Sequence, residues 1–208
     1  MKNFALKISL VASMVYSFAL ADGLFTGIES DYSFQSNLKV KYNNAGDTGI
    51  IKYKKAQAGI GLKAGYDFDR YRVYSSYIYD FQASKDMSYD PDYTVKWLTH
   101  KFILGADYTP SITYNFKLAV GPYGGYSRLK VKINDITGYS DKDSKNGWLI
   151  GAKIGGIYSF DKNNELEIGF KADKTNYGKM AEFDSEEFNA DNVKEINYGL
   201  YLGYNYKF

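Results

Sequence analysis

The last thirteen residues of the chain alternate strictly between apolar side chains and smaller or more polar ones. They read Ile196-Asn197-Tyr198-Gly199-Leu200-Tyr201-Leu202-Gly203-Tyr204-Asn205-Tyr206-Lys207-Phe208. Every even-numbered position is aliphatic or aromatic, whereas the odd positions hold mainly glycine, asparagine and lysine. A period of two residues is typical of a β-strand with one apolar face. The segment therefore predicts a strand that runs to the terminal Phe208.

The same alternation recurs along the whole chain, in 24–35, 57–68, 71–81, 96–108, 114–127, 148–161 and 165–174. With 195–208 these segments make eight predicted strands of 10–14 residues. In 96–108 we choose the phase that keeps Lys101 away from lipid, because a lysine at the bilayer midplane costs ~2–4 kcal/mol. A bilayer-crossing strand needs ~9–11 residues, whereas strands of globular proteins average ~5–6. The length of the strands is thus itself an indication of a membrane protein.

Hydrocarbon cannot hydrogen-bond free backbone groups, so a sheet in a membrane must close on itself. The sequence therefore predicts an all-β fold, an eight-stranded antiparallel up-and-down transmembrane β-barrel with its apolar face outward. The connections alternate between long (36–56, 82–95, 128–147, 175–194) and short (69–70, 109–113, 162–164). Outer-membrane barrels have short periplasmic turns and longer extracellular loops. Alternation continues at 38–40, 51–53 and 129–133, which predicts hairpins that protrude outside the cell.

The first 21 residues have the features of an export signal. Lys2 and Lys7 precede a mostly apolar stretch, residues 8–19, which is too short to span a bilayer as a helix. Ala19 and Ala21 then form a small-x-small cleavage pattern. We predict a signal peptide over 1–21, cleaved before Asp22, and one barrel domain over 22–208.

Composition excludes several classes of function. The chain has no cysteine and one histidine, which excludes disulfide scaffolds, cysteine nucleophiles and multi-histidine metal sites. Lys2 and Lys7 are the only charged residues before Asp22, so the predicted mature chain keeps 24 basic and 24 acidic side chains and no net formal charge. A global basic field for nucleic acid is therefore absent. The 22 tyrosines and 13 phenylalanines suit a membrane–water interface.

The polar faces of the strands place ionisable residues inside the predicted barrel. An eight-stranded lumen is just wide enough to be filled by side chains, and buried charges must pair. We expect the acidic residues near mid-barrel to face the basic ones, either as a plug of ion pairs and water or, alternatively, as the lining of a narrow pore. The residues concerned are Glu29, Asp31, Lys63, Arg72, Lys101, Lys117, Lys153, Glu167 and Lys171.

Taken together, the mature chain resembles the small eight-stranded outer-membrane barrels of the OmpA/OmpX type, which include opacity-type surface proteins. The most specific part of the resemblance is the C-terminal strand quoted above. The resemblance implies that Tyr204, Tyr206 and Phe208 form an assembly signal that the barrel-insertion machinery reads.

Some small barrels modify lipids, so catalysis has to be considered. His100 is the only candidate general base of a Ser–His mechanism, but Phe102 occupies the next position on its face and Thr99 lies on the opposite face. The acids Asp135, Asp141 and Asp143 are too loosely spaced to indicate a Ca²⁺ site. We therefore predict no enzyme activity, no metal site and no cofactor.

The long connections carry opposite charges. The first has Lys39, Lys41, Lys52, Lys54 and Lys55, and the last has Glu182, Asp184, Glu186, Glu187 and Asp191, with Glu195 just beyond it. Barrel closure makes these connections neighbours, so they form either a bipolar binding surface or a set of mutual ion pairs of little energy. Tyr89, Tyr93, Tyr139 and Phe188 are candidate contact anchors, or rest on the barrel rim.

These observations predict an integral protein of the outer membrane of a Gram-negative bacterium, exported through the periplasm. Its role is structural in the envelope or a surface interaction of the adhesin type, made through the extracellular loops. Alternatives are a narrow channel and, less favoured, a lipid-modifying enzyme. The expected partners are outer-membrane lipid, the barrel-assembly machinery and an extracellular ligand or host surface, with no nucleic acid, and we expect a monomer.

Overall fold

The computed structural model describes residues 23–44, 47–86, 93–135, 140–180 and 189–208, and they form nine strands. The strands are β1 (Leu24–Asn44), β2 (Asp47–Asp67), β3 (Tyr71–Asp86), β4 (Tyr93–Tyr108), β5 (Ser111–Thr113), β6 (Phe116–Asp135), β7 (Ser140–Ser159), β8 (Asn164–Met180) and β9 (Asn189–Lys207). No helix among the described residues is long and apolar enough to cross a membrane.

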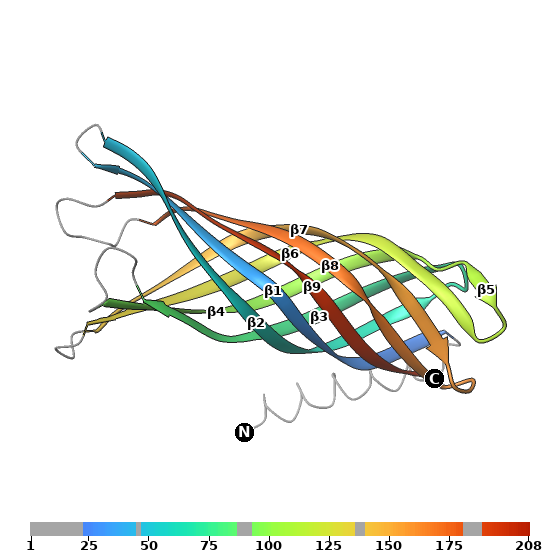
Figure 1. Ribbon diagram of the computed structural model, residues 1–208. Helices are drawn as coiled ribbons and strands as arrows, with labels where there is room; N and C mark the ends of the chain where they lie inside the picture. Colours follow the sequence, from blue (N-terminus) through green and yellow to red (C-terminus); the bar gives the residue numbers. More distant parts are fainter. Residues whose placement is uncertain (1–22, 45–46, 87–92, 136–139, 181–188) are drawn as a thin grey trace, which may run out of the picture.

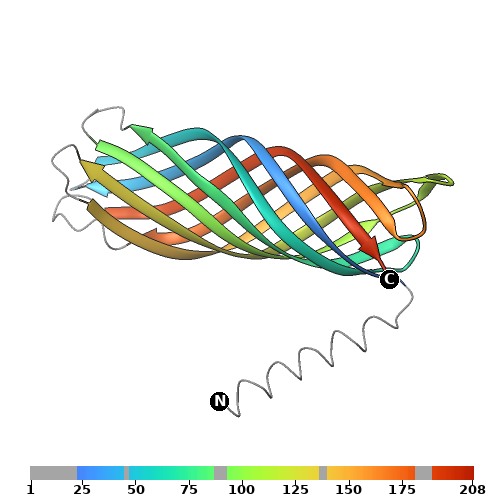
Figure 2. The same cartoon turned by 90° about the horizontal axis from the view of Figure 1, so that it is seen from below.

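Eight long strands close into one antiparallel barrel, as the alternation predicted (Figures 1 and 2). Each long strand pairs with the next long strand of the chain, so that β4 pairs with β6, and β9 returns to pair with β1. The three-residue β5 is an addition that no alternation pattern predicted, and it lies in the connection between β4 and β6. The confirmed fold is therefore the predicted eight-stranded barrel with one short extra strand.

The long strands have 16 to 21 residues, so the prediction of 10–14 was too short. Most of each predicted long connection is strand, and the barrel extends well past the predicted membrane edge. We call the end where β3 and β6 finish the long-hairpin end, and the opposite end, where β9 finishes, the short-turn end (Figure 1). Above Gly59 the ladder between β2 and β3 ends, and the paired ends of β1 and β2 stand apart from β3 (Figure 1).

An apolar belt surrounds the middle of the barrel. Its side chains point outward and remain accessible, as Leu62 (65% exposed), Ile154 (53%) and Phe170 (59%) show. Aromatic residues gather at both edges of the belt, with Phe34, Tyr126 and Trp148 toward the long-hairpin end and Tyr71, Phe160 and Phe208 toward the short-turn end. Apolar bands between aromatic girdles are the surface that outer-membrane barrels present to lipid.

Beyond the belt, at the long-hairpin end, the polarity of the two faces is reversed. The interior there is a packed apolar layer instead of a charged lumen. Its buried members are Leu38, Val40, Tyr53, Ala83, Val95, Trp97, Leu129, Val131, Tyr177 and Val193. We call this set the apolar layer. An apolar inside and a polar outside are what a barrel needs when water surrounds it, so this part of the barrel is built for an aqueous environment.

Two β-bulges shift the phase of the inward-facing side chains where the polarity changes. In β1 the pairing with β2 shifts between Ser33 and Ser36, and in β3 the pairing with β4 shifts between Asp80 and Ala83. In β1 the residues that point inward are odd-numbered before the bulge and even-numbered after it. Even-numbered Leu38 therefore points into the barrel, whereas even-numbered Ile28, before the bulge, faces outward.

The turn at 161–164, predicted short, is held by one side chain. Asp161 Oδ1 accepts hydrogen bonds from the backbone amides of Asn163 and Asn164, both at 2.8 Å. The Asn164 side chain and these amides hold the pKa of Asp161 below its usual range. At the short turn between β2 and β3, Asp69 adopts φ 72°, a left-handed conformation that aspartate tolerates in turns.

Candidate functional site: the lumen and the basic outer face

A network of ion pairs fills the middle of the lumen, and Glu167 on β8 is its centre. Its carboxylate accepts Lys63 Nζ at 3.0 Å and Lys153 Nζ at 2.8 Å, from β2 and β7 respectively. Lys63 also pairs with Glu29 at 3.1 Å, and Lys153 with Asp107 at 2.8 Å. All five side chains are 10% exposed or less. Each lysine is thus held between two of the three carboxylates, inside a space that water hardly reaches.

Aromatic rings fill the remaining lumen. The Tyr74 ring lies 5.2 Å from Lys63 Nζ and 4.3 Å from Lys153 Nζ, and Tyr201 packs on Lys153 as well. The ring of Tyr74 occupies the place that a Cβ at Gly105 would need, which explains why that inward position is glycine. The lumen cavity lined by Glu29, Tyr74, Lys153 and their neighbours measures about 20 Å³. That volume holds about one water molecule.

Toward the short-turn end a second cluster surrounds Arg72. Its guanidinium lies 2.7 Å from both Asp67 and Glu165 and stacks over the Phe25 ring. Lys117, at the mouth of the barrel, reaches Asp69 at 3.4 Å and Asp67 at 3.6 Å. Toward the long-hairpin end Lys171 pairs with Asp31.

The nine sequence-selected ionisable residues therefore lie in the barrel interior or at its mouth, but not all pair as expected. Glu29, Asp31 and Glu167 face Lys63, Lys153 and Lys171. The expectation that they also face Arg72, Lys101 and Lys117 was wrong. Lys101 instead pairs with Asp80 at 2.9 Å and Asp173 at 3.6 Å. These cations lie at other levels along the barrel axis than Glu29, Asp31 and Glu167. The strand register brings different acids to the level of each cation.

Above the ion pairs, Glu195 forms the floor of the apolar layer. Ser36 donates to its carboxylate at 2.9 Å and Tyr177 at 2.7 Å, and the side chain has no exposed surface. Trp97 lies directly over this group, with Nε1 3.4 Å from Ser36 Oγ. Glu195 therefore does not belong to the surface charges of the last connection, because its position on β9 points inward.

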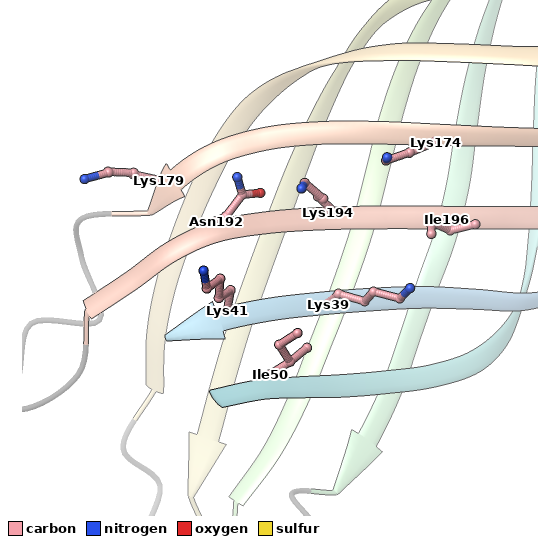
Figure 3. A pocket seen from close by; sticks show the side chains of 8 residues that line it. All are labelled: Lys39, Lys41, Ile50, Lys174, Lys179, Asn192, Lys194 and Ile196. Carbon is pink, nitrogen blue, oxygen red and sulfur yellow. The ribbon is translucent and has the colours of Figure 1, made fainter. Parts of the chain in front are cut away.

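The outer face of the long-hairpin end carries a basic groove of about 550 Å³ (Figure 3). Its walls come from the four neighbouring strands β1, β2, β8 and β9. The lining residues are Lys39, Lys41, Ile50, Lys174, Lys179, Asn192, Lys194 and Ile196. Sequence reasoning singled out Lys39, Lys41, Lys52 and Lys54 as loop charges, but they lie on strands and on the outward face. Lys174 and Lys194 were missed, although each stands between two inward residues, Asp173 and Thr175 around Lys174 and Val193 and Glu195 around Lys194.

A second basic groove, of about 300 Å³, lies over β4, β6 and β7. Lys96, Lys130, Lys132 and Lys142 line it together with one acid, Asp143. Sequence reasoning missed it, because 128–147 was interpreted mainly as a loop.

His100 lies on the outer face among tyrosines. Its Nδ1 is 2.8 Å from the Tyr77 hydroxyl, and the ring packs 5.1 Å from that of Tyr79. Within the described part of the chain, no group of three or more His, Cys, Asp or Glu side chains could hold a metal ion.

Several predicted features fall outside what the structure describes. They are the cleavage residues Ala19 and Ala21, the anchors Tyr89, Tyr139 and Phe188, and the acids Glu182, Asp184, Glu186 and Glu187. The side chains of Asp135, Asp141 and Asp191 are also outside the described residues. Tyr93 is half-buried at the start of β4.

The fold is that of the small outer-membrane barrels of Gram-negative bacteria, as comparison with solved structures shows. Neisserial surface protein A matches with a TM-score of 0.54 at 16% identity, over 89% of this chain and 97% of the other. The attachment invasion locus protein Ail of Yersinia pestis, solved with the heparin analogue sucrose octasulfate, matches with a TM-score of 0.52 at 21% identity, over 90% and 100%. A major outer membrane protein of Thermus thermophilus matches with a TM-score of 0.54 at 14% identity, over 89% and 99%. No protein-family model and no curated protein sequence matches the chain.

Proposed function

We propose that this protein is a monomeric, non-enzymatic protein of the Gram-negative outer membrane, exported through the periplasm after removal of residues 1–21. Its barrel is a closed anchor, and its long-hairpin end stands on the cell surface. The role is to contribute to envelope integrity or to a surface interaction. The observation that carries this proposal is that the interior is filled twice, by the ion-pair network and by the apolar layer.

Orientation follows from the two ends of the barrel. Outer-membrane barrels keep short turns in the periplasm and place longer loops outside the cell. The long-hairpin end is therefore extracellular, and its apolar interior and lysine-rich exterior suit surrounding water. Ail, which has a similar fold, was solved with a heparin analogue. That complex and the basic grooves of this chain support an interaction with an anionic partner at the surface.

The closed interior predicts that the barrel does not conduct. In planar bilayers we expect no discrete current steps from the purified protein, because the lumen cavity at the ion-pair network has room for about one water. Glu29→Gln and Lys63→Met are the diagnostic variants, since they alter the network without touching the hairpins. Discrete openings whose size or selectivity changes in these variants would establish the channel instead.

The C-terminal strand provides a second test, on assembly. Phe208 is 45% exposed on the lipid face, and its ring packs 5.2 Å from that of Tyr206. We expect Phe208→Ala to leave most of the protein as periplasmic aggregate in cells, while the stability of refolded protein in detergent changes by less than about 1 kcal/mol. Membrane yield measured by fractionation, and unfolding measured in micelles, separate the two effects.

Phe160 is a matched control for Phe208. It is 57% exposed at the same end of the barrel and packs 5.3 Å from Tyr158 in the same edge-on geometry. Phe160→Ala removes an equivalent contact without changing the terminus, so it should insert normally. Equal yields for the two variants would show that the terminal aromatic residue has no special part in assembly.

A further inference from the structure

The pairing of β2 with β3 does not continue to the long-hairpin end of the barrel. The ladder that joins these strands ends at the pair formed by Gly59 and Asp80. Beyond it, among the described strands, residues 47–58 of β2 pair only with β1, and residues 83–86 of β3 pair only with β4. The paired ends of β1 and β2 lie apart from β3 in this region (Figure 1). We call the two unpaired edges, residues 47–58 of β2 and 81–86 of β3, the seam.

We propose that the seam binds an extended segment of another protein, which adds to the edge of β2 as a further strand and in which apolar residues alternate with acidic ones. A strand edge with unpaired backbone groups is a template for such an addition. The inference deepens the proposed surface interaction by naming the chemical class of the partner. It rests on that proposal for the position of the seam outside the cell.

The backbone of β2 offers unpaired donors and acceptors to such a strand. The amide of Asp67 donates to Gly23 O at 2.8 Å, on the side of β1. Backbone groups point alternately to the two sides of a strand, and the extra residue of the bulge belongs to β1, so the alternation along β2 is unbroken. Even-numbered residues such as Ala56 therefore direct their amides toward the seam. At its lower end Phe81 O accepts the side chain of Gln57 at 2.8 Å instead of a backbone amide of β2.

The side chains along the edge of β2 indicate the sequence pattern of the partner. Lys52 and Lys54 are exposed on the outer face, whereas Ile51 and Tyr53 pack inward against the apolar layer. Across the seam Ala83 also belongs to that layer. A strand beside β2 presents its side chains to the same two faces. Acidic residues would then meet the lysines outside, and apolar residues would cover the apolar layer inside.

The lysines disfavour a second copy of this chain as the occupant. Lys52, Lys54 and Lys55 are all exposed along the edge of β2. Pairing of two such edges would bring lysines close to lysines, and like charges on adjacent strands destabilise a sheet. Lysine on an exposed edge protects a sheet against self-association. An acidic strand meets attraction instead of repulsion, so the same charges select the partner and reject copies of the chain.

The test uses the full mature chain folded in detergent micelles and fluorescent synthetic peptides long enough to span residues 50–58 of β2. We expect a peptide in which valine alternates with glutamate to bind, as measured by fluorescence anisotropy. A peptide of the same composition with all glutamates in one block should not bind, nor should one in which valine alternates with lysine. Methylation of the peptide amides at all valines or at all glutamates should abolish binding in at least one of the two cases, because one of these sets faces β2.

Two variants of the protein test the edge itself. Ala56→Pro removes an amide that points toward the seam without removing a hydrogen bond to β1, and it should weaken binding by about threefold to tenfold, the contribution of one backbone hydrogen bond. Ala56→Val keeps the amide and should bind like the wild type. Lys52→Gln combined with Lys54→Gln should weaken binding by about twofold to tenfold. Arg70→Gln combined with Lys162→Gln removes the same charge at the short-turn end and should have no effect.

Equal binding of the block peptide, or binding that survives both methylated forms, would overturn the proposal in favour of an anion held by charge alone. Dimers of the protein that Ala56→Pro abolishes would overturn it in favour of a second copy. The gel mobility of unheated protein shows that each variant is folded. Binding of the alternating peptide to intact cells that produce the protein tests its orientation separately. Binding in micelles but not on cells would contradict the proposed surface exposure and would still support the seam as a strand-binding site.

Discussion

Glu167→Gln is expected to lower the free energy of unfolding by about 3–5 kcal/mol, because two buried hydrogen bonds lose their charged acceptor and each such bond contributes about 1.5–3 kcal/mol. Glu167 is 2% exposed and is the only acid that joins Lys63 to Lys153 among the described ion pairs. In the variant each ammonium group keeps a single carboxylate, Glu29 for Lys63 and Asp107 for Lys153, and loses its second one. Guanidinium unfolding in detergent micelles, followed by fluorescence, measures the loss.

Asp69→Asn is the matched control for that measurement. Asp69 is also paired with a lysine, at 3.4 Å, but its side chain is 81% exposed. An exposed pair contributes about 0–1 kcal/mol, so the control should unfold close to the wild type. Adding Lys63→Met to Glu167→Gln leaves Glu29 buried without its lysine partner and should deepen the loss. If Glu167→Gln behaves like Asp69→Asn, the lumen network does not stabilise the barrel.

Trp97→Ala is expected to cost about 3–5 kcal/mol as well, but the damage should be confined to the long-hairpin end. Trp97 has no exposed surface and packs in the apolar layer, above the ion pairs. Its loss leaves a cavity between strands that are surrounded by water and not held by lipid. Amide hydrogen exchange should therefore accelerate around Val95 and Leu129, while amides of the belt keep their protection. Uniform acceleration along the whole barrel would contradict the idea of two separate layers.

Trp148 supplies the control, since it is 75% exposed on the outer girdle. Trp148→Ala should leave exchange in the apolar layer unchanged. The chain has two tryptophans, so each variant retains a single fluorescence reporter in a known place. Trp97 reports on the apolar layer, and Trp148 reports on the contact with detergent or lipid.

The membrane-embedded half of the barrel was predictable because lipid imposes a simple rule. Each strand there has one face that must be apolar, and the cost of placing Lys101 or Lys153 in hydrocarbon decides which face points inward. Burial of both lysines agrees with that choice. The half beyond the membrane was largely missed because the rule reverses there, and bulges at Ser33 and Asp80 change the phase. Two stretches, around Val40 and Val131, carried enough alternation to predict protruding hairpins.

The amino-acid sequence by itself determined the architecture of this protein. It contains the period of two, the strand lengths that suit a bilayer and the alternation of short and long connections, all of which are local properties of the chain. Only the tertiary structure decided which charges meet and which lysines line one groove. Pairs such as Lys63 with Glu167, and neighbours such as Lys39 and Lys194, are far apart in the chain. Their contacts depend on strand register and barrel closure, which arise from all eight long strands together and from no segment alone.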